Sequence, residues 1–444
     1  MQQSKNFFVG TCSMTDLLQQ NMAIIRRRWP EVAQTMDAAN PDSLDAMLVT
    51  GANHTISVNG IQLSSCYNRL AEAELMINQL PAWCSTVSVY GVGMGDVPTL
   101  LSDNKHLEHI RICPLNLNLL VLLLSYTDQS EWLSDLRVVL EPNPRQDELA
   151  QHYIAIISDL QLISDHNARL RDLLMFHNNL AFANKRHKPE DVKFQRRLAD
   201  NLETIKQDPD AASLSLLFQP SKTLVIGTGP SLEQHYDYLR AQMALPLATR
   251  PLMIAVDTAL KALVNENIIP DIVISLDYNI SLAHLPEVLP EKVKLVYFPR
   301  SQPQVLHAWP GERFAAYSLN ETYDELNSRY PKLRLFANGS VIHPAIDLAV
   351  YLKSKQIILF GCDFCYPKNK THAFWPEGKL GPSITDSKHH WVINGHGDKV
   401  ITHLNFRGYL LALEHYIRTK PEVAFYNSSL EGAAIKGTLY LECK

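Results

Sequence analysis

A glycine-rich segment in the second half of the chain is the first candidate for chemistry. Gly227-Thr228-Gly229-Pro230-Ser231-Leu232 follows the apolar run 223–226 and precedes a helical pattern. Glycines let a backbone approach a ligand closely, and the hydroxyl and amide of Ser231 would then meet a phosphate at a helix N-terminus. The segment lacks the lysine of a Walker loop, which excludes ATP binding by that route. A capped turn without a ligand is the alternative.

Carboxylates follow two further apolar runs. Asp257 ends the run 253–257, and Asp277 ends the run 272–277, with Asn279 two residues later. Because ligands gather at the carboxyl ends of parallel strands, we expect these side chains at the edge that also carries the glycine turn, where they would hold a ribose or a base. Each aspartate taken alone is also a plausible helix N-cap.

Three later segments would complete such a site. Asn338-Gly339-Ser340 precedes a helix, and Asp363 closely follows the run 356–360. A long loop punctuated by Gly and Pro, at about 366–400, is typical of an active-site lid or of a disordered segment. It carries His372, His389, His390 and His396 without a ligand pair on a clear helix, so we predict no metal site. One of these histidines could serve as a general base near neutral pH.

A second glycine turn lies in the first half of the chain. Gly91-Val92-Gly93-Met94-Gly95 follows the strand predicted at 87–90 and resembles the first turn of a nucleotide site. The dinucleotide fingerprint requires a third glycine where Asp96 stands, and a carboxylate about 20 residues on, where the chain has none. A tight turn without a cofactor is favoured, and a nucleotide site stays open.

The elements that position these residues alternate between strands and helices. Strands are predicted at 223–226, 253–257, 272–277, 294–298 and 356–360 in the second half, and at 87–90, 109–113 and 137–140 in the first. A hairpin is predicted around Asn59-Gly60, a helix at 67–80, and a long helical region at about 146–180. This order predicts an α/β fold with two Rossmann-like, doubly wound units.

We expect three parts along the chain. Residues 1–145 form an N-terminal helical plus Rossmann-like domain, residues 146–219 a helical linker, and residues 220–444 the second Rossmann-like domain, with the lid loop and a C-terminal helix around 406–418.

Composition narrows the function classes. The chain has 444 residues, a net charge of −5 and 46% hydrophobic residues, as in an ordinary soluble globular protein. This balance argues against a nucleic-acid-binding protein, and no apolar run approaches the length of a membrane span. The seven cysteines, with Cys362 and Cys365 in a CxxC, fit reduced thiols better than disulfides. A cytoplasmic protein is expected.

Several motifs together resemble the motility accessory factor (Maf) family, and the resemblance covers nearly the whole chain. They are the two glycine turns, Pro270 to Asp277, Asn338-Gly339-Ser340, Phe360 to Tyr366 with Thr371-His372-Ala373, and Asn427 to Ala433. The segment from Asn59 to Ala73, and Leu140-Glu141-Pro142-Asn143, also look like that family's N-terminal domain. The central domain is similar to bacterial sialyltransferases and to 6-hydroxymethylpterin diphosphokinase-like proteins.

The resemblance implies a glycosyltransferase. Such an enzyme would move a nonulosonic acid, pseudaminic or legionaminic, from a CMP-activated donor to Ser or Thr of flagellin, as flagellum assembly and motility require. No further cofactor is needed, the partners are the CMP-sugar and flagellin or another protein acceptor, and a homo-oligomer stays open. Two other functions also stay open: a pterin diphosphokinase-like enzyme that holds Mg²⁺ and ATP through Asp257 and Asp277, and a flagellin-binding factor without catalysis.

The same resemblance implies roles for individual residues. Tyr366 and His372 lie near two positions that help the phosphate to leave, and His390 lies near the position of the catalytic base. The donor would be bound by Gly227, Thr228, Gly229, Pro230, Ser231, Asp257, Asp277, Asn279, Asn338, Gly339, Ser340 and Asp363.

Overall fold

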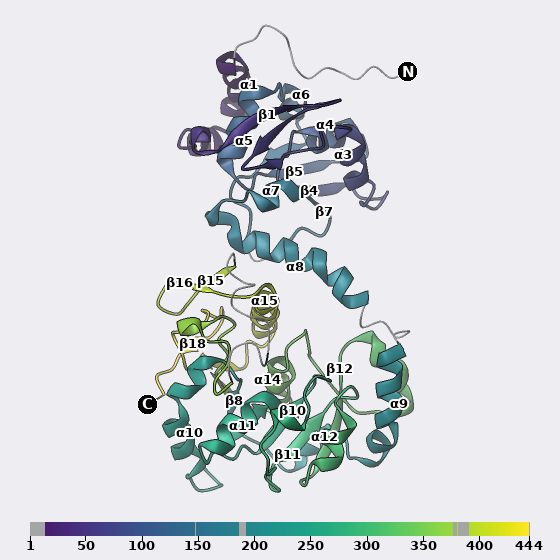
Figure 1. The fold of residues 1–444 in the computed structure, drawn as a ribbon, viewed down its shortest axis with the longest axis vertical. Coiled ribbons are helices and arrows are strands. Elements are labelled where there is room, and N and C mark those ends of the chain that lie inside the picture. The colour runs from purple at the N-terminus through teal and green to yellow at the C-terminus, as the bar shows by residue number, and fades with distance from the viewer. Residues whose placement is uncertain (1–13, 147, 186–191, 376–379, 381–389, 444) are drawn as a thin grey trace. The chain divides into compact units, whose positions relative to one another are not determined.

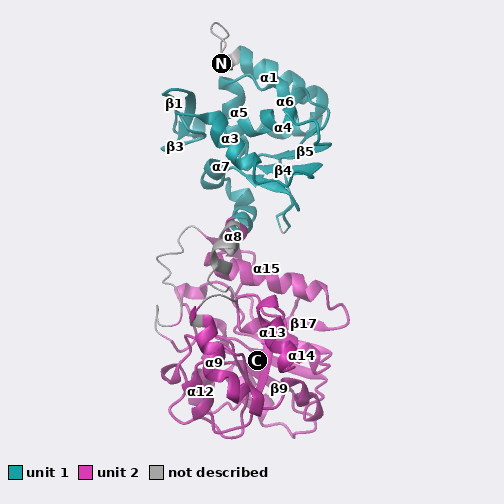
Figure 2. Ribbon diagram, turned by 90° about the vertical axis from the view of Figure 1, so that its right-hand side faces the viewer, with its two compact units in different colours: residues 1–174 teal, residues 175–444 magenta. Residues whose placement is uncertain are grey.

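The computed structural model describes residues 14–146, 148–185, 192–375, 380 and 390–443 (Figure 1). The chain divides into two compact units, residues 1–174 and 175–444 (Figure 2). The division falls inside the segment 146–219 that was predicted as a linker. Among the described residues, no helix has both the length and the apolar character that crossing a bilayer needs.

A four-stranded parallel sheet forms the centre of unit 1. Its order is β6-β5-β4-β7, which in chain order is 3-2-1-4 and is typical of a Rossmann-like half. The strands are β4 (Thr86–Tyr90), β5 (His109–Cys113), β6 (Val138–Leu140) and β7 (Tyr153–Ala155). The predicted strands at 87–90, 109–113 and 137–140 are therefore confirmed, and β7 is an addition.

Helices and a small antiparallel sheet complete unit 1. The turn at Asn59 and Gly60, both with positive φ, joins β2 to β3 and confirms the predicted hairpin. The antiparallel sheet holds β1 (Ala46–Thr50), β2 (His54–Val58) and β3 (Ile61–Gln62). The helices are α1 (Met14–Arg28), α2 (Pro30–Met36), η1 (Pro41–Ser43), α3 (Arg69–Ile77), α4 (Asp96–Asp103), α5 (Leu117–Tyr126), α6 (Ser130–Ser134), α7 (Ile157–Gln161) and η2 (Asp165–Asn167).

The predicted helical region at about 146–180 is partly wrong. Helix α8 (Ala168–Lys185) occupies its second half, whereas β7 and α7 occupy its first half. Because β7 pairs with β4, residues 153–155 belong to the sheet of unit 1 and not to a linker.

A nine-stranded parallel sheet forms the centre of unit 2 (Figure 1). Its order is β13-β12-β11-β10-β9-β8-β14-β17-β18, and every recorded pairing is parallel. The strands are β8 (Lys222–Ile226), β9 (Leu252–Val256), β10 (Ile272–Ser275), β11 (Lys294–Tyr297), β12 (Arg313–Ser318), β13 (Leu333–Leu335), β14 (Gln356–Phe360), β17 (Ala424–Asn427) and β18 (Leu439–Tyr440). The central strands are continuous apolar runs because both faces of the sheet are covered.

The sheet of unit 2 reverses its strand order once. From β8 the chain adds strands outward to β13, and it then returns to place β14 on the other side of β8. Ligands of such sheets bind beyond the carboxyl ends of the strands at this switch point, here between β8 and β14. The predicted doubly wound α/β architecture is confirmed.

Helices and a second hairpin flank this sheet. The helices are α9 (Val192–Gln207), η3 (Ala211–Leu216), η4 (Pro230–Gln234), α10 (Tyr236–Met243), α11 (Asp257–Asn265), η5 (Leu282–His284), α12 (Pro303–Ala308), η6 (Glu321–Tyr323), α13 (Asp324–Arg329), α14 (Ile342–Tyr351), η7 (Pro367–Asn369) and α15 (Leu404–Arg418), which contains the predicted C-terminal helix. The hairpin pairs β15 (Trp391–Ile393) with β16 (Lys399–Ile401).

Candidate active site

A pocket of about 140 Å³ lies at the switch point of unit 2. Both glycine-containing turns after β8 and β14 line it, together with residues from the start of α11, the start of α14, the 371–372 segment and α15. The lining residues are Gly227, Thr228, Gly229, Val256, Thr258, Ser340, Val341, Ile342, Gly361, Cys362, Asp363, Phe364, Cys365, Thr371, His372, Phe406 and Tyr409. Segments far apart in the sequence therefore converge where the topology places a ligand.

The two turns cross at backbone contact distance. The N–H of Gly227 donates to the carbonyl of Phe360 (2.8 Å), and the N–H of Gly229 donates to the carbonyl of Gly361 (2.7 Å). A Cβ on Gly227 would lie 2.6 Å from the Gly361 oxygen, and Gly361 itself has a φ of +59°. Both glycines are therefore required by the crossing itself, before any ligand is considered.

Asp363 holds the start of η4 against the turn after β14. Its buried carboxylate accepts from the Ser231 N–H (2.8 Å) and from the Ser231 hydroxyl (2.6 Å). Burial raises the pKa of Asp363 to about 6, and the two bonds from Ser231 act against this rise. Ser231 thus has a carboxylate partner where the sequence led us to expect a phosphate, and Pro230 is buried outside the pocket lining.

Asp257 and Asp277 follow neighbouring strands, as expected, but differ in exposure. Asp257 is buried, and its carboxylate accepts from the Ser275 hydroxyl and the Thr258 N–H, both at 2.8 Å. Burial raises the pKa of Asp257 to about 7, and the charge of Asp277 makes a smaller contribution. Asp277 is exposed and accepts from the N–H of the exposed Asn279 at 2.9 Å. None of these three residues lines the pocket.

Asp257→Asn is expected to stabilise the chain at alkaline pH. Because the folded-state pKa is raised, the contribution of Asp257 to stability is fully present below the unfolded-state pKa and is lost as the pH rises through about 7. Asparagine carries no charge, and it can accept from Thr258 and donate to Ser275. We expect a gain of about 1–3 kcal/mol at pH 8 and little at pH 4, measured by urea unfolding.

The matched control for this variant is Asp277→Asn, at the exposed neighbouring carboxylate, which should change stability by less than about 0.5 kcal/mol. An Asp257→Asn effect of equal size at both pH values would show that ionisation of this carboxyl does not destabilise the fold.

A buried histidine fixes the Asn338-Gly339-Ser340 turn to α15. His343 accepts from the Asn338 N–H at Nδ1 (3.2 Å) and donates from Nε2 to the Tyr409 carbonyl (3.0 Å). Burial lowers the pKa of His343 to about 4, so the ring is neutral. Of the turn, Ser340 lines the pocket, whereas Asn338 and Gly339 are exposed outside it.

His372 lies in the pocket as a neutral imidazole. Its buried Nδ1 has no hydrogen-bond partner among the described residues, and burial lowers its pKa to about 4. The next residue holds the segment in place, since the Ala373 N–H donates to the Thr228 carbonyl at 2.8 Å. The hydroxyls of Thr228 and Thr258 hydrogen-bond at 2.5 Å beside it. A neutral, desolvated imidazole of this kind can accept a proton from a substrate hydroxyl.

Tyr366 and His390 lie elsewhere. Tyr366 is buried and packs against Phe406, with 5.5 Å between ring centroids, outside the pocket lining. His390 directly precedes β15, where its carbonyl accepts from the Thr402 N–H at 2.9 Å, and it does not line the pocket. Of the predicted lid loop, residues 376–379 and 381–389, with His389, lie outside the described residues.

The pocket also contains residues that the sequence did not single out. Thr258 directly follows Asp257 and could have been found by extending that motif by one residue. Phe406 and Tyr409 come from α15, where only tertiary structure brings them to the pocket. Cys362 and Cys365, which the sequence predicted as reduced thiols, also line the pocket; both are buried and free, and burial raises the pKa of both. In the described part of the chain, no three His, Cys, Asp or Glu residues are grouped to hold a metal.

Comparison with known proteins finds a family model that matches the central segment and a solved structure that is similar. No curated protein matches the sequence. The solved structure of MAf glycosyltransferase from Magnetospirillum magneticum AMB-1 is similar, with a TM-score of 0.45 and 14% sequence identity, and the match covers 97% of this chain and 75% of that one. Residues 196–369, which contain β8 to β14, match the family model described as 6-hydroxymethylpterin diphosphokinase MptE-like. The predicted resemblance to pterin diphosphokinase-like proteins is therefore confirmed for this segment.

Proposed function

We propose that the chain is a glycosyltransferase that moves a nonulosonic acid, of the pseudaminic or legionaminic type, from a CMP donor to a Ser or Thr hydroxyl of a protein. Flagellin is the proposed acceptor, and flagellum assembly and motility the proposed process. The observation that carries the proposal is the neutral imidazole of His372 in a pocket at the switch point, beside two crossed glycine turns.

The proposed reaction exchanges one bond at the anomeric carbon for another. The bond from this carbon to the CMP phosphate breaks, the bond to the acceptor hydroxyl oxygen forms, and the hydroxyl proton must be accepted. His372 can accept that proton because its Nδ1 is not engaged in a hydrogen bond. Thr228 and Thr258 line the same pocket, and whichever of their two hydroxyls accepts the hydrogen bond between them can donate its own proton to the departing phosphate. His390, which the family resemblance suggests as the base, is the alternative proton acceptor.

A second candidate is an ATP-dependent diphosphokinase, and two observations favour it. The family model that matches residues 196–369 carries this description. In addition, Asp257 and Asp277 follow adjacent strands and are close enough for the charge of Asp277 to raise the pKa of Asp257. A Mg²⁺ ion bound between the two carboxylates would relieve this repulsion and could hold a triphosphate.

Thermal unfolding with added nucleotide separates the two functions. If CMP binds the folded chain, CMP at about 100 times its dissociation constant should stabilise the chain by roughly 2.7 kcal/mol, whereas ATP with Mg²⁺ should have little effect. UMP is the matched control for the base. Stabilisation by ATP with Mg²⁺ alone would favour the diphosphokinase. The absence of any nucleotide effect, with flagellin still captured, would favour a binding factor without catalysis.

A further inference from the structure

The glycine turn of unit 1 has the conformation of an anion-binding turn. It follows β4, and Gly91, Gly93 and Gly95 have φ values of +99°, +57° and +85°. Residues other than glycine rarely adopt such φ values. Where residues with positive φ alternate with residues of negative φ, successive backbone N–H groups turn toward one point. In nucleotide-binding folds, that point holds a phosphate.

In this chain, a side chain of unit 1 occupies that point. Asp159, on α7, accepts from the Val92 N–H at Oδ1 (2.7 Å) and from the Gly93 N–H at Oδ2 (2.9 Å). The residue is 3% exposed, and a Cβ on Gly91 would lie 2.6 Å from the Cβ of Asp159. The carboxylate therefore takes both donors of the turn and the space in front of them.

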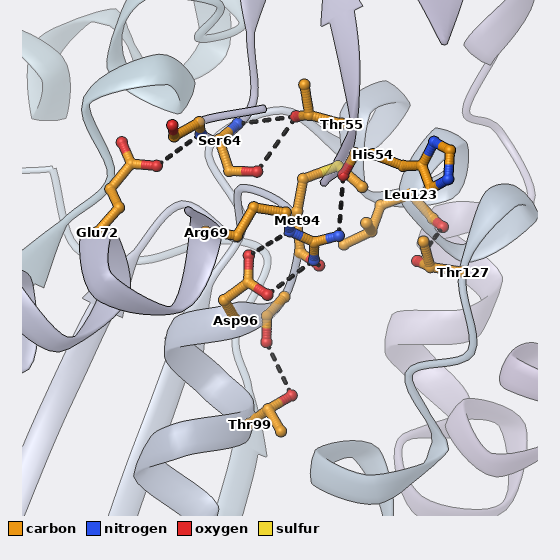
Figure 3. Close-up of polar contacts among 12 residues, drawn as sticks. His54, Thr55, Ser64, Arg69, Glu72, Met94, Asp96, Thr99, Leu123 and Thr127 are labelled. Carbon is orange, nitrogen blue, oxygen red and sulfur yellow. Dashed lines mark hydrogen bonds and ion pairs between the residues drawn. The ribbon is translucent and has the colours of Figure 1, made fainter. Parts of the chain in front are cut away.

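The neighbouring residues close the remaining space. Arg69 binds both carboxylate oxygens of Asp96, at 3.0 and 2.7 Å, directly after the turn (Figure 3). On the other side, a Cβ on Gly95 would lie 2.0 Å from the Gln129 Oε1. The hollow between α3 and the turn measures only about 20 Å³. The point in front of the Val92 and Gly93 N–H groups is itself filled by the Asp159 carboxylate, so a phosphate could reach these donors only by displacing Asp159.

We infer that the glycine turn of unit 1 is an anion site that the chain fills permanently with its own Asp159 carboxylate, so that this turn binds no nucleotide phosphate. The inference concerns a site that the proposed function does not use, and it holds whichever nucleotide unit 2 takes.

The energetics agree with an internal ligand. Burial raises the pKa of Asp159 to about 6, while the two N–H bonds favour the charged form. Truncation of this side chain would leave two buried N–H groups without an acceptor, in a space with the shape of a carboxylate. A small carboxylate from solution should then enter and restore both hydrogen bonds.

Chemical rescue in the full-length chain tests this inference. We expect Asp159→Ala to lower the melting temperature by roughly 5 °C or more. Sodium acetate at about 0.2 M should recover at least half of this loss, and sodium chloride at the same ionic strength should not. The matched control is Leu101→Ala on α4, where the side chain is fully buried and apolar, and acetate should give no specific recovery. Equal recovery by both salts would overturn the inference.

A second measurement uses the unmodified chain and does not depend on how the variant folds. Crystals soaked in inorganic phosphate, and crystals soaked in CMP, should show no anion bound to the N–H groups of Val92 and Gly93. A phosphate or nucleotide that displaces Asp159 from the turn would overturn the inference. Failure of CMP to bind at all would count against the proposed function and would leave the acetate result unaffected.

Discussion

His372→Ala is expected to lower the turnover number for sugar transfer by roughly 10²-fold or more, with a much smaller change in CMP affinity. This factor is the usual contribution of a general base, equal to about 2.7 kcal/mol of transition-state stabilisation. The expectation rests on the place of His372 in the pocket and on its unengaged Nδ1. CMP release from a CMP-nonulosonate with flagellin as acceptor measures turnover, and calorimetry measures CMP binding.

The pH dependence provides a second readout for His372. Burial lowers its pKa to about 4, so the imidazole remains neutral and competent as a base at neutral and mildly acidic pH. We therefore expect turnover to show no loss from protonation of His372 until the pH falls toward 4. A base with an ordinary histidine pKa would lose activity already near pH 6.5.

His390→Ala is the matched control. It removes the histidine that the family resemblance suggests as the base, at a half-buried position outside the pocket lining. We expect a loss of turnover well below that of His372→Ala. If His390→Ala lost 10²-fold and His372→Ala retained full turnover, the base would be His390 and the proposed role of His372 would be wrong.

The sequence predicted the strands that are long apolar runs. β8, β9, β11 and β14 were found within one residue of their ends, since a strand buried on both faces of a parallel sheet is largely apolar. β5 was found through its alternation of exposed and buried residues. In the two parallel sheets, the strands that were not predicted are β7, β12, β13, β17 and β18. β7, β13 and β18 have only two or three residues, too few for a periodic pattern. β7 becomes part of its sheet by pairing with β4, which is distant in sequence, and no local pattern contains this pairing.

The candidate site was predictable where its residues lie in the turns that follow strands. Gly227, Thr228 and Asp363 were found for this reason, and the parallel sheet brings them to one edge. Tyr409 was not found because it lies on helix α15, about 180 residues after Thr228, and only the tertiary structure brings the two residues to one pocket. Asp159 was missed because its role depends on a turn 66 residues earlier, which it contacts only after the sheet of unit 1 has formed.

The sequence identified several side chains of the candidate site, but it did not identify the groups that they contact. The hydroxyl of Ser231 suits a phosphate and a carboxylate equally well, and only the return of the chain through β14 places Asp363 beside it. The same holds in unit 1, where a glycine turn typical of nucleotide binding contacts Asp159. In both units, an aspartate from a segment distant in sequence accepts the hydrogen bonds of the N–H groups at the glycine turn. A sequence motif identifies the turn, but it does not identify the group that the turn binds.

Gly227→Ala is expected to destabilise unit 2 by about 3 kcal/mol or more and to abolish stabilisation by CMP. The new Cβ would lie 2.6 Å from the Gly361 carbonyl oxygen, and no side-chain rotation can relieve a contact with backbone. Neither turn can move away easily, because the Gly227 N–H donates to Phe360 and β8 pairs with β14 over five residues. Separation of the turns would break the crossing that lines the pocket. Urea unfolding measures the stability, and thermal shift with CMP measures the site.

The matched control is Gly397→Ala, in the hairpin between β15 and β16 of the same unit. Gly397 has a φ of +92°, but a Cβ there would meet no atom within 4 Å. This variant should incur only the strain of an alanine at positive φ, about 1–2 kcal/mol, and should still be stabilised by CMP. If the two variants unfolded alike, the crossing of the turns would not be tight in solution. If Gly227→Ala lost stability but kept the full CMP shift, nucleotide binding would not depend on this crossing, and the pocket at the switch point would lose its place in the proposed function.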